Sequence, residues 1–197
     1  MNRPLTLGDV LDLRAYERER EAFRAEVIAL KKLRRVAIGP LASAVFENST
    51  TVRFQVQEMV RAEMILEDRR VQDELDAYNP LVPGRGELSL TLFLELRSEQ
   101  DLRTWLPRLV GIERSLLVRF GAGTGLERRG EVEAAHSSML TREETTSSVH
   151  YVKITLGEEE IGTFVEGPAV LACDHPEYPH AVELESDLRL SLAGDWS

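Results

Sequence analysis

Cysteine, histidine and long apolar runs are scarce in this sequence, and each shortage excludes a class of site or protein. The 197 residues include one cysteine, Cys173, and four histidines. A single cysteine excludes an intrachain disulfide and any zinc or iron–sulfur site built only from cysteines of one chain. No stretch approaches about 18 uninterrupted apolar residues, and the N-terminal segment lacks the apolar core of a secretory signal. We therefore expect a cytoplasmic protein without a membrane span.

The familiar catalytic and phosphate-binding motifs are also absent. The sequence contains no P-loop, no His-Glu-x-x-His, no Gly-x-Ser-x-Gly and no Cys-x-x-Cys. The glycine-rich run 121–125 precedes charged, strand-like sequence rather than a helix, so we interpret it as a hairpin loop. A net charge of −10 argues against general binding to nucleic acids or anionic membranes. The one basic run, residues 31–35, is interpreted as the complement of a helix dipole.

Helical and strand-like patterns together predict a single α+β domain over residues 1–197, with a mainly antiparallel sheet. Thr6 is expected to cap a long N-terminal helix that ends near Arg34. Two central helices are predicted next, over residues 50–66 and 71–78. Strands are expected at 35–38, 42–46, 87–96, 115–120, 126–134, 147–156 and 169–174, with shorter helices at 98–109 and 158–165; residues 186–193 fit either a strand or a helix.

The first central helix is unusual because its apolar residues cover every side. At about 100° per residue, Phe54 and Ile65 share one direction, whereas Val56 and Val60 point in others. A surface helix keeps its apolar residues in one stripe. This helix is therefore predicted to be buried on several sides, with polar side chains that need partners. Those side chains are Arg53, Gln55, Gln57, Glu58, Arg61 and Glu63.

The strand over 87–96 has two clearly different faces. Its leucines at every second position must face the core. The other face carries Glu87, Ser89, Thr91 and Glu95. We favour a solvated face with structural ion pairs, and the alternative is the wall of a polar pocket in which Arg53 or Arg61 pairs with the carboxylates. The residues of that alternative pocket are Gln55, Gln57, Glu58, Arg61, Glu87, Ser89 and Thr91.

Two histidines are candidate metal ligands. His150 alternates with apolar residues, so it is expected to point toward the core, where a hydrogen-bonded structural role is favoured. His175 lies in the segment Cys-Asp-His-Pro-Glu-Tyr-Pro-His, which is interpreted as a turn at the end of a strand with exposed histidines. The metal-binding alternative would combine His150 and His175 with carboxylates such as Glu58 or Glu87, to hold iron, manganese or zinc.

Several long strings carry a resemblance to a known family: VFEN, TVRFQVQEMVRAE, ELDAYNPLVPGRGELSLTLFLEL, SSVHYV and DHPEY. Together they resemble a bacterial family named domain of unknown function 3501, over nearly the whole chain. The resemblance implies no activity or cofactor. Members are often encoded beside rubrerythrin-like proteins and iron–sulfur oxidoreductase subunits. The resemblance therefore implies a role as a partner of such proteins in redox or oxidative-stress physiology.

Three functional hypotheses remain after these observations. The first is an accessory or interaction protein of a bacterial redox system, as the resemblance implies. The second is a metal-dependent enzyme that uses histidine and carboxylate ligands. The third is a small-molecule-binding protein built on Gln55, Gln57, Arg61 and the face with Ser89 and Thr91, which a concave pocket at those residues would favour. The sequence itself assigns no cofactor, reaction or oligomeric state.

Overall fold

The computed structural model describes residues 3–132 and 145–196, and it has the predicted α+β architecture. The strands are β1 (Arg35–Ile38), β2 (Ala42–Phe46), β3 (Glu87–Leu94), β4 (Leu116–Phe120), β5 (Leu126–Arg129), β6 (Glu131–Val132), β7 (Val149–Thr155), β8 (Ala169–His175) and β9 (Tyr178–Glu183). They form two antiparallel sheets, where the patterns had suggested one. The first sheet has the order β1-β2-β3-β7-β6, and the second has the order β5-β4-β8-β9.

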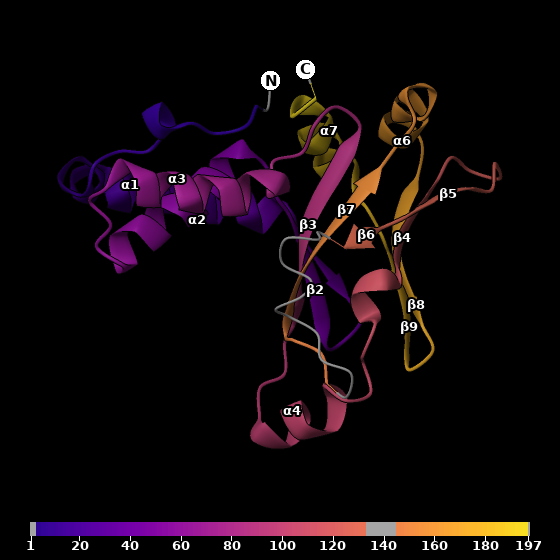
Figure 1. The fold of residues 1–197 in the computed structure, drawn as a ribbon. Helices are drawn as coiled ribbons and strands as arrows, with labels where there is room; N and C mark the ends of the chain where they lie inside the picture. Colours follow the sequence, from indigo (N-terminus) through magenta and orange to yellow (C-terminus); the bar gives the residue numbers. More distant parts are fainter. Residues whose placement is uncertain (1–2, 133–144, 197) are drawn as a thin grey trace.

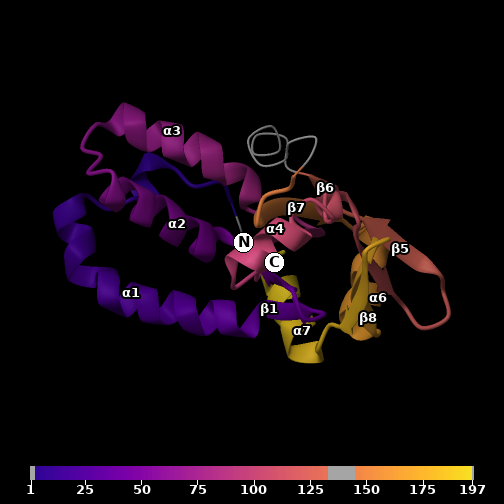
Figure 2. The same ribbon diagram turned by 90° about the horizontal axis from the view of Figure 1, so that it is seen from below.

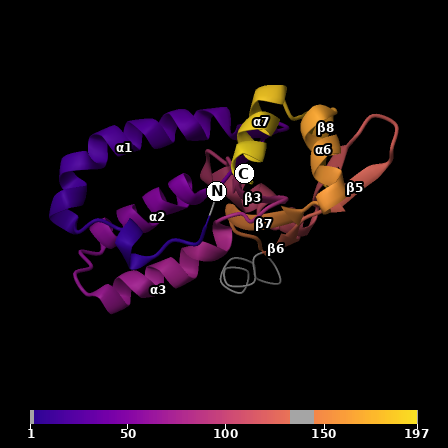
Figure 3. The same ribbon diagram turned by 90° about the horizontal axis from the view of Figure 1, so that it is seen from above.

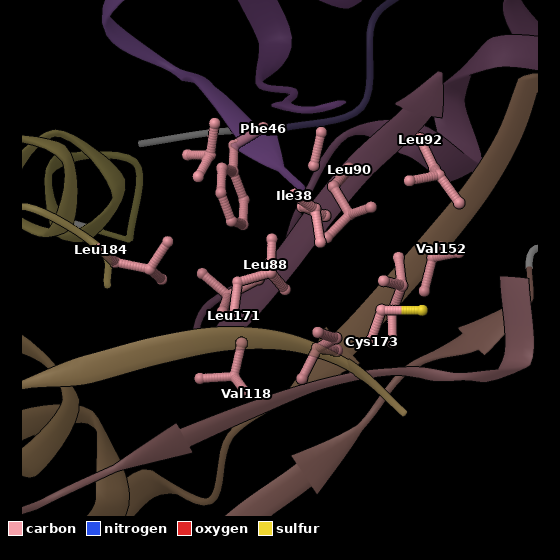
Figure 4. Packing of buried hydrophobic residues seen from close by; sticks show 14 of the residues in the cluster. Ile38, Phe46, Leu88, Leu90, Leu92, Val118, Val152, Leu171, Cys173 and Leu184 are labelled. Carbon is pink, nitrogen blue, oxygen red and sulfur yellow. The ribbon is translucent and has the colours of Figure 1, made fainter. Parts of the chain in front are cut away.

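The main core lies between the two sheets. On β3, Leu88, Leu90 and Leu92 are buried in this core, which confirms the face predicted from the period of two. They lie in one cluster with Val118 of β4 and Leu171 of β8 (Figure 4). The leucine face of β3 is therefore the inner face of the first sheet, and the polar face is its outer face.

The two sheets approach each other along both edges, so the strands form a flattened, barrel-like assembly. At one edge the Tyr178 hydroxyl of β9 donates to the Ile38 carbonyl of β1 at 2.6 Å. At the other edge β5 is followed by β6 after Gly130, whose amide donates to the Leu116 carbonyl at 2.8 Å. A Cβ atom at residue 130 would lie 2.3 Å from Val152 Cγ1. Glycine therefore breaks the single strand expected over 126–134, where the chain passes between sheets. The last two residues of that prediction lie outside the described residues.

Three helices pack together beside the outer face of the first sheet (Figure 1). They are the long N-terminal helix α1 (Leu13–Leu33) and the two central helices α2 (Ser49–Ala62) and α3 (Asp68–Tyr78). α2 lies between α1 and α3 (Figures 2 and 3). Every residue from Ser49 to Arg61 is buried or half-buried, as the apolar residues on all sides predicted, but the helix expected to reach residue 66 ends at Ala62, and Leu66 beyond it is 81% exposed. None of the helices in the described part of the chain is long and apolar enough to cross a membrane.

The N-terminal helix begins later than predicted. Thr6 precedes only a single turn of 3-10 helix, η1 (Leu7–Asp9). α1 starts at Leu13, where the Asp12 side chain accepts a hydrogen bond from the Ala15 amide at 2.8 Å. Aspartate is a preferred N-cap residue, so this second cap is the one that begins the long helix.

Shorter helices lie at the two ends of the barrel (Figure 1). The helix expected over 98–109 ends at Trp105, because Pro107 lacks an amide and cannot continue the hydrogen-bond pattern. The ambiguous segment 186–193 forms a helix whose Leu188 and Leu192 enter the main core. The remaining helical elements are α4 (Glu99–Trp105), η3 (Ile112–Arg114), η4 (Glu158–Glu160), α6 (Ile161–Glu166) and α7 (Ser186–Gly194), whereas η2 (Asn79–Leu81) directly follows α3 and packs with the helical bundle.

Among the strands in residues 3–132 and 145–196, β9 (Tyr178–Glu183) is the one that the patterns did not predict. β8 and β9 form a hairpin in which His175 pairs with Tyr178. The turn predicted at the end of the strand is present at residues 176–177, but the histidines beside it are not exposed. His175 is buried, with 7% of its surface exposed. The prolines in this segment suggested a loop, yet Pro179 pairs with Asp174 on the sheet edge, where a missing amide donor is tolerated.

A buried ion pair connects the helical bundle with the C-terminal helix. Arg34 follows α1 and is 2% exposed. Its guanidinium donates to Asp195 at 2.6 Å and to the Ser191 carbonyl at 2.7 Å. The Asn48 side chain, which caps α2, donates to the other Asp195 oxygen at 3.2 Å. The interpretation of the basic run as a dipole complement therefore fails for Arg34, although the lysines of the run lie in the last turn of α1.

Candidate functional site

A cavity of about 220 Å³ lies where the three helices meet the first sheet, and we call it the helix–sheet cavity. Its walls come from the end of α1, the link between β2 and α2, the first half of α2, the end of α3, and the outer faces of β3 and β7. The lining residues are Lys31, Glu47, Thr51, Val52, Gln55, Tyr78, Leu81, Thr91, Phe93, Val149 and Tyr151.

The pairing of β3 with β7 places four of these side chains. Thr91 is opposite Tyr151, and Phe93 is opposite Val149. Directly paired residues in an antiparallel sheet point to the same face, which here is the outer face. Thr91 is only 4% exposed. The expectation of a solvated outer face is therefore wrong for the centre of β3, because the helical bundle covers it.

The ends of that face follow a different pattern. Glu87 pairs with Lys153 at 3.1 Å, and Glu95 pairs with Arg35 at 3.1 Å. Both carboxylates thus form the structural ion pairs that we favoured, but their partners are strand residues rather than Arg53 or Arg61. Arg53 instead stacks over the Phe23 ring at 4.4 Å.

Glu47 is the most buried charged group of the cavity, with a side chain that is 7% exposed. Its amide donates to the Ser89 carbonyl at 2.8 Å, which anchors the residue directly after β2. Its Oε1 accepts a hydrogen bond from the Thr91 hydroxyl at 2.6 Å. Its Oε2 lies 3.8 Å from Lys31 Nζ. The short link to α2 and the strand β3 therefore hold a carboxylate against the cavity in one orientation.

Two tyrosines and a glutamine complete the polar part of the wall. Tyr78 ends α3, Tyr151 belongs to β7 and Gln55 belongs to α2. Burial, followed by the proximity of Tyr78 and Glu47, raises the pKa of Tyr151. The Tyr151 phenol therefore stays protonated at neutral pH and keeps its hydrogen-bond donor. The wall combines hydroxyl, amide, ammonium and carboxylate groups with apolar side chains, which is the composition of a small-molecule site.

The seven residues of the pocket that the sequence suggested do not all meet at one place. Gln55 and Thr91 line the cavity. Ser89 is buried on the same strand face but outside the lining residues. The Gln57 amide bonds to both the amide and the carbonyl of Leu11, at 2.9 Å each. Arg61 pairs with Glu17, and the other two residues, Glu58 and Glu87, also bind partners outside the cavity.

Glu58 forms a cluster between α1 and α2. Its Oε1 accepts from the Tyr16 hydroxyl at 2.7 Å, and Arg20 donates to both carboxylate oxygens at 2.8 Å. The hydrogen bond from Arg20, together with that from Tyr16, lowers the pKa of Glu58 to about 2, although burial opposes the shift. This group therefore stabilises the packing of α1 on α2 rather than a ligand.

Acid is expected to weaken this cluster in a defined pH window. Because the pKa of Glu58 is lower in the folded chain, its stabilisation is present above the ordinary pKa of 4.5 and is lost as the pH falls toward 2. Glu58→Gln should make the free energy of unfolding less dependent on pH in that window, by about 1–2 kcal/mol once screening by water is allowed for. Urea unfolding between about pH 6 and pH 3 measures the difference. Glu21→Gln, on the exposed side of α1, is the control and should behave as the wild type.

The two candidate histidine ligands have other partners. His150 points into the core, as expected, and its Nε2 lies 2.9 Å from both the Ser147 carbonyl and the Thr146 hydroxyl. Burial lowers its pKa, although Glu113 opposes the shift. His175 Nε2 lies 3.2 Å from the Val110 carbonyl. Among residues 3–132 and 145–196, no group of three or more histidine, cysteine, aspartate or glutamate side chains is arranged to hold a metal ion.

A wider groove lies between η1, α1 and α2, with a volume of about 530 Å³. Several of its side chains, such as Arg18, Glu19 and Glu26, are exposed to solvent. An exposed charge is well solvated and interacts only weakly with a ligand. The helix–sheet cavity is smaller, but its charged group is buried, so it is the stronger candidate site.

Comparisons with known proteins identify relatives but no activity. A model of the family described as protein of unknown function (DUF3501) matches residues 4–196. A crystal structure of a novel protein of unknown function from Burkholderia pseudomallei K96243, at 1.90 Å resolution, has a TM-score of 0.89 to this chain. The two chains are 37% identical over 99% of this chain and 100% of the other. The comparison with curated proteins found no match.

Proposed function

Because the chain belongs to the DUF3501 family, whose description assigns no activity, we propose from the geometry that it binds a compact small molecule in the helix–sheet cavity. The observation that carries this proposal is the buried Glu47 carboxylate at the cavity wall. A charged group loses much of its hydration on burial, so it is usually fully paired unless a ligand completes its environment. Glu47 Oε1 accepts a hydrogen bond from the Thr91 hydroxyl. Glu47 Oε2 lies 3.8 Å from Lys31 Nζ, which is longer than a hydrogen bond.

The size of the cavity sets the size of the ligand. An apolar cavity of about 150 Å³ holds one benzene molecule, and drug-sized ligands need about 300 Å³ or more. The helix–sheet cavity, at about 220 Å³, lies between these values. It suits a ligand somewhat larger than benzene, such as a small metabolite, and is too small for a dinucleotide.

Filling the cavity tests this proposal. Val149 is the first residue of β7, lines the cavity and is half-buried, so Val149→Trp should occupy the ligand volume. We expect the wild type, purified from its native host, to carry a bound compound that native mass spectrometry detects, and Val149→Trp to lose at least about nine-tenths of it. Leu190→Trp adds the same side chain at an exposed position of α7 and is the control. Equal retention of the compound by both variants would contradict the proposal.

A role as an accessory protein of a bacterial redox system is a second proposal, and its support is the family resemblance. It predicts an association with rubrerythrin-like or iron–sulfur oxidoreductase proteins of the same cell. Affinity purification of the chain from its native host, followed by mass spectrometry, tests it. Repeated recovery of no redox protein would count against it. The two proposals are compatible, because a bound metabolite can accompany a protein partner.

A further inference from the structure

Glu47 and Lys31 present one acidic and one basic group to the same cavity. Their nearest charged atoms are 3.8 Å apart, which exceeds the usual N–H···O distance of about 2.7–3.2 Å. Because Oε1 of Glu47 already accepts from Thr91, Oε2 has the spare acceptor capacity. The wall therefore offers a ligand a hydrogen-bond acceptor, Glu47 Oε2, next to the donors of the Lys31 ammonium group.

The charges at this place favour a ligand that carries both signs. A ligand with only a positive charge would be attracted by Glu47 but repelled by Lys31, and a ligand with only a negative charge would meet the reverse. The Glu47 side chain is 7% exposed and that of Lys31 is 29% exposed. The acid therefore lies deeper than the base, and interactions with it are less screened by water.

The rest of the wall restricts the body of the ligand. Val52, Leu81, Phe93 and Val149 supply apolar surface around the charged pair, and the Gln55 amide can both donate and accept. An apolar group of a few carbons or one small ring would be buried against these side chains. A strongly hydrated body, such as a sugar, would leave its hydroxyls against apolar walls at an energetic cost.

We propose that the ligand is a free amino acid in its zwitterionic form, with an aliphatic or aromatic side chain. Its ammonium group would donate to Glu47 Oε2, and its carboxylate would accept from Lys31 Nζ. The two charged groups of an amino acid are bonded to one carbon, so their separation resembles the 3.8 Å between the protein groups. This inference rests on the proposed function and gives the helix–sheet cavity its ligand class.

Matched compounds test the inference, because they differ only in the charged groups. Isothermal titration calorimetry on the purified full chain compares leucine with isoamylamine, which lacks the carboxylate, and with isocaproate, which lacks the amine. Phenylalanine, phenethylamine and hydrocinnamate form the aromatic set. We expect one of the two amino acids to bind at least about tenfold more tightly than its amine and its acid.

Two variants assign the charged groups. Glu47→Gln keeps the shape of the side chain and should weaken the amino acid about tenfold to hundredfold, while the matched acid binds as before or more tightly. Lys31→Met should weaken the amino acid but not the matched amine. Lys32→Met, exposed on the same helical turn, is the control and should leave all affinities unchanged. Thermal unfolding confirms that each variant is folded.

The outcomes separate this inference from the proposed function. An amine or an acid that binds as tightly as its amino acid, with loss of binding in Val149→Trp, overturns the ligand class and leaves the site standing. If native mass spectrometry finds a bound compound other than an amino acid, the ligand class is likewise overturned and the site stands. No binding of any of the six compounds overturns the ligand class, and the native mass spectrum then decides the function alone.

Discussion

Replacing Arg34 by methionine is expected to lower the free energy of unfolding by about 3–5 kcal/mol. Arg34 is 2% exposed and holds Asp195, the Ser191 carbonyl and, through Asp195, the cap of α2. Methionine fills most of the volume but leaves the Asp195 carboxylate, whose side chain is 12% exposed, without its cation. A buried charge that loses its partner keeps its full desolvation cost. Urea unfolding at neutral pH measures the change.

Two further variants separate the charge from the packing. Asp195→Leu combined with Arg34→Met removes both charges, so the double variant should be more stable than Arg34→Met alone. Arg69→Met, at an exposed position of α3, should change the free energy of unfolding by no more than about 0.5 kcal/mol. A loss below about 1 kcal/mol for Arg34→Met would mean that this ion pair does not connect the helical bundle to α7.

Leu90→Ala is expected to cost about 2–5 kcal/mol, because it opens a cavity at the centre of the main core. Leu90 is fully buried on the inner face of β3, among side chains from both sheets (Figure 4). The loss combines the transfer free energy of the removed methyl groups with the packing that its neighbours cannot recover. Chemical denaturation of the purified variant measures the effect, provided that the slope with denaturant concentration is unchanged.

The matched control for this variant is Leu66→Ala. Leu66 is the same residue type but is 81% exposed, after the end of α2. Its replacement should change the free energy of unfolding by no more than about 0.5 kcal/mol. Comparable losses for Leu90→Ala and Leu66→Ala would contradict the assignment of the inner face of β3.

Local patterns predicted the parts of the fold that depend on neighbours in sequence. The alternation of Leu88, Leu90 and Leu92 fixes a strand face, because successive side chains of a strand point to opposite sides. The apolar residues on all sides of α2 predicted its burial on several sides, which its place between α1 and α3 provides. By contrast, the chain passes from the second sheet to the first at Gly130, and one glycine carries little signal before the space around it is known.

The helix–sheet cavity was predicted only in part, because its wall joins segments that lie far apart in the sequence. Gln55 and Thr91 belong to a helix and a strand whose patterns were informative. Lys31 was interpreted as a dipole complement, which its place in the last turn of α1 still allows. Glu47 lies between a strand and a helix cap, in a string that contributed to the family resemblance but showed no chemical role. The pairing of β3 with β7, which sequence patterns cannot specify, brings Tyr151 to the same face.

The histidines show the converse limit. The alternation around His150 correctly placed it toward the core, and its partners there are a carbonyl and a hydroxyl. His175 was expected in an exposed turn, because Pro176 and Pro179 follow it. The hairpin of β8 and β9 buries it instead, since an edge strand such as β9 accepts a proline.

The most direct test of the central claim is to map the binding site by heteronuclear NMR while the amino acid with the highest affinity is added. The account predicts that the largest amide shifts cluster at residues 47–55, 78–81, 91–93 and 149–151, which belong to the walls of the helix–sheet cavity. It also predicts that these shifts disappear in Val149→Trp. Shifts centred on the groove between η1, α1 and α2, or shifts that persist in Val149→Trp, would contradict the assignment of the helix–sheet cavity as the functional site.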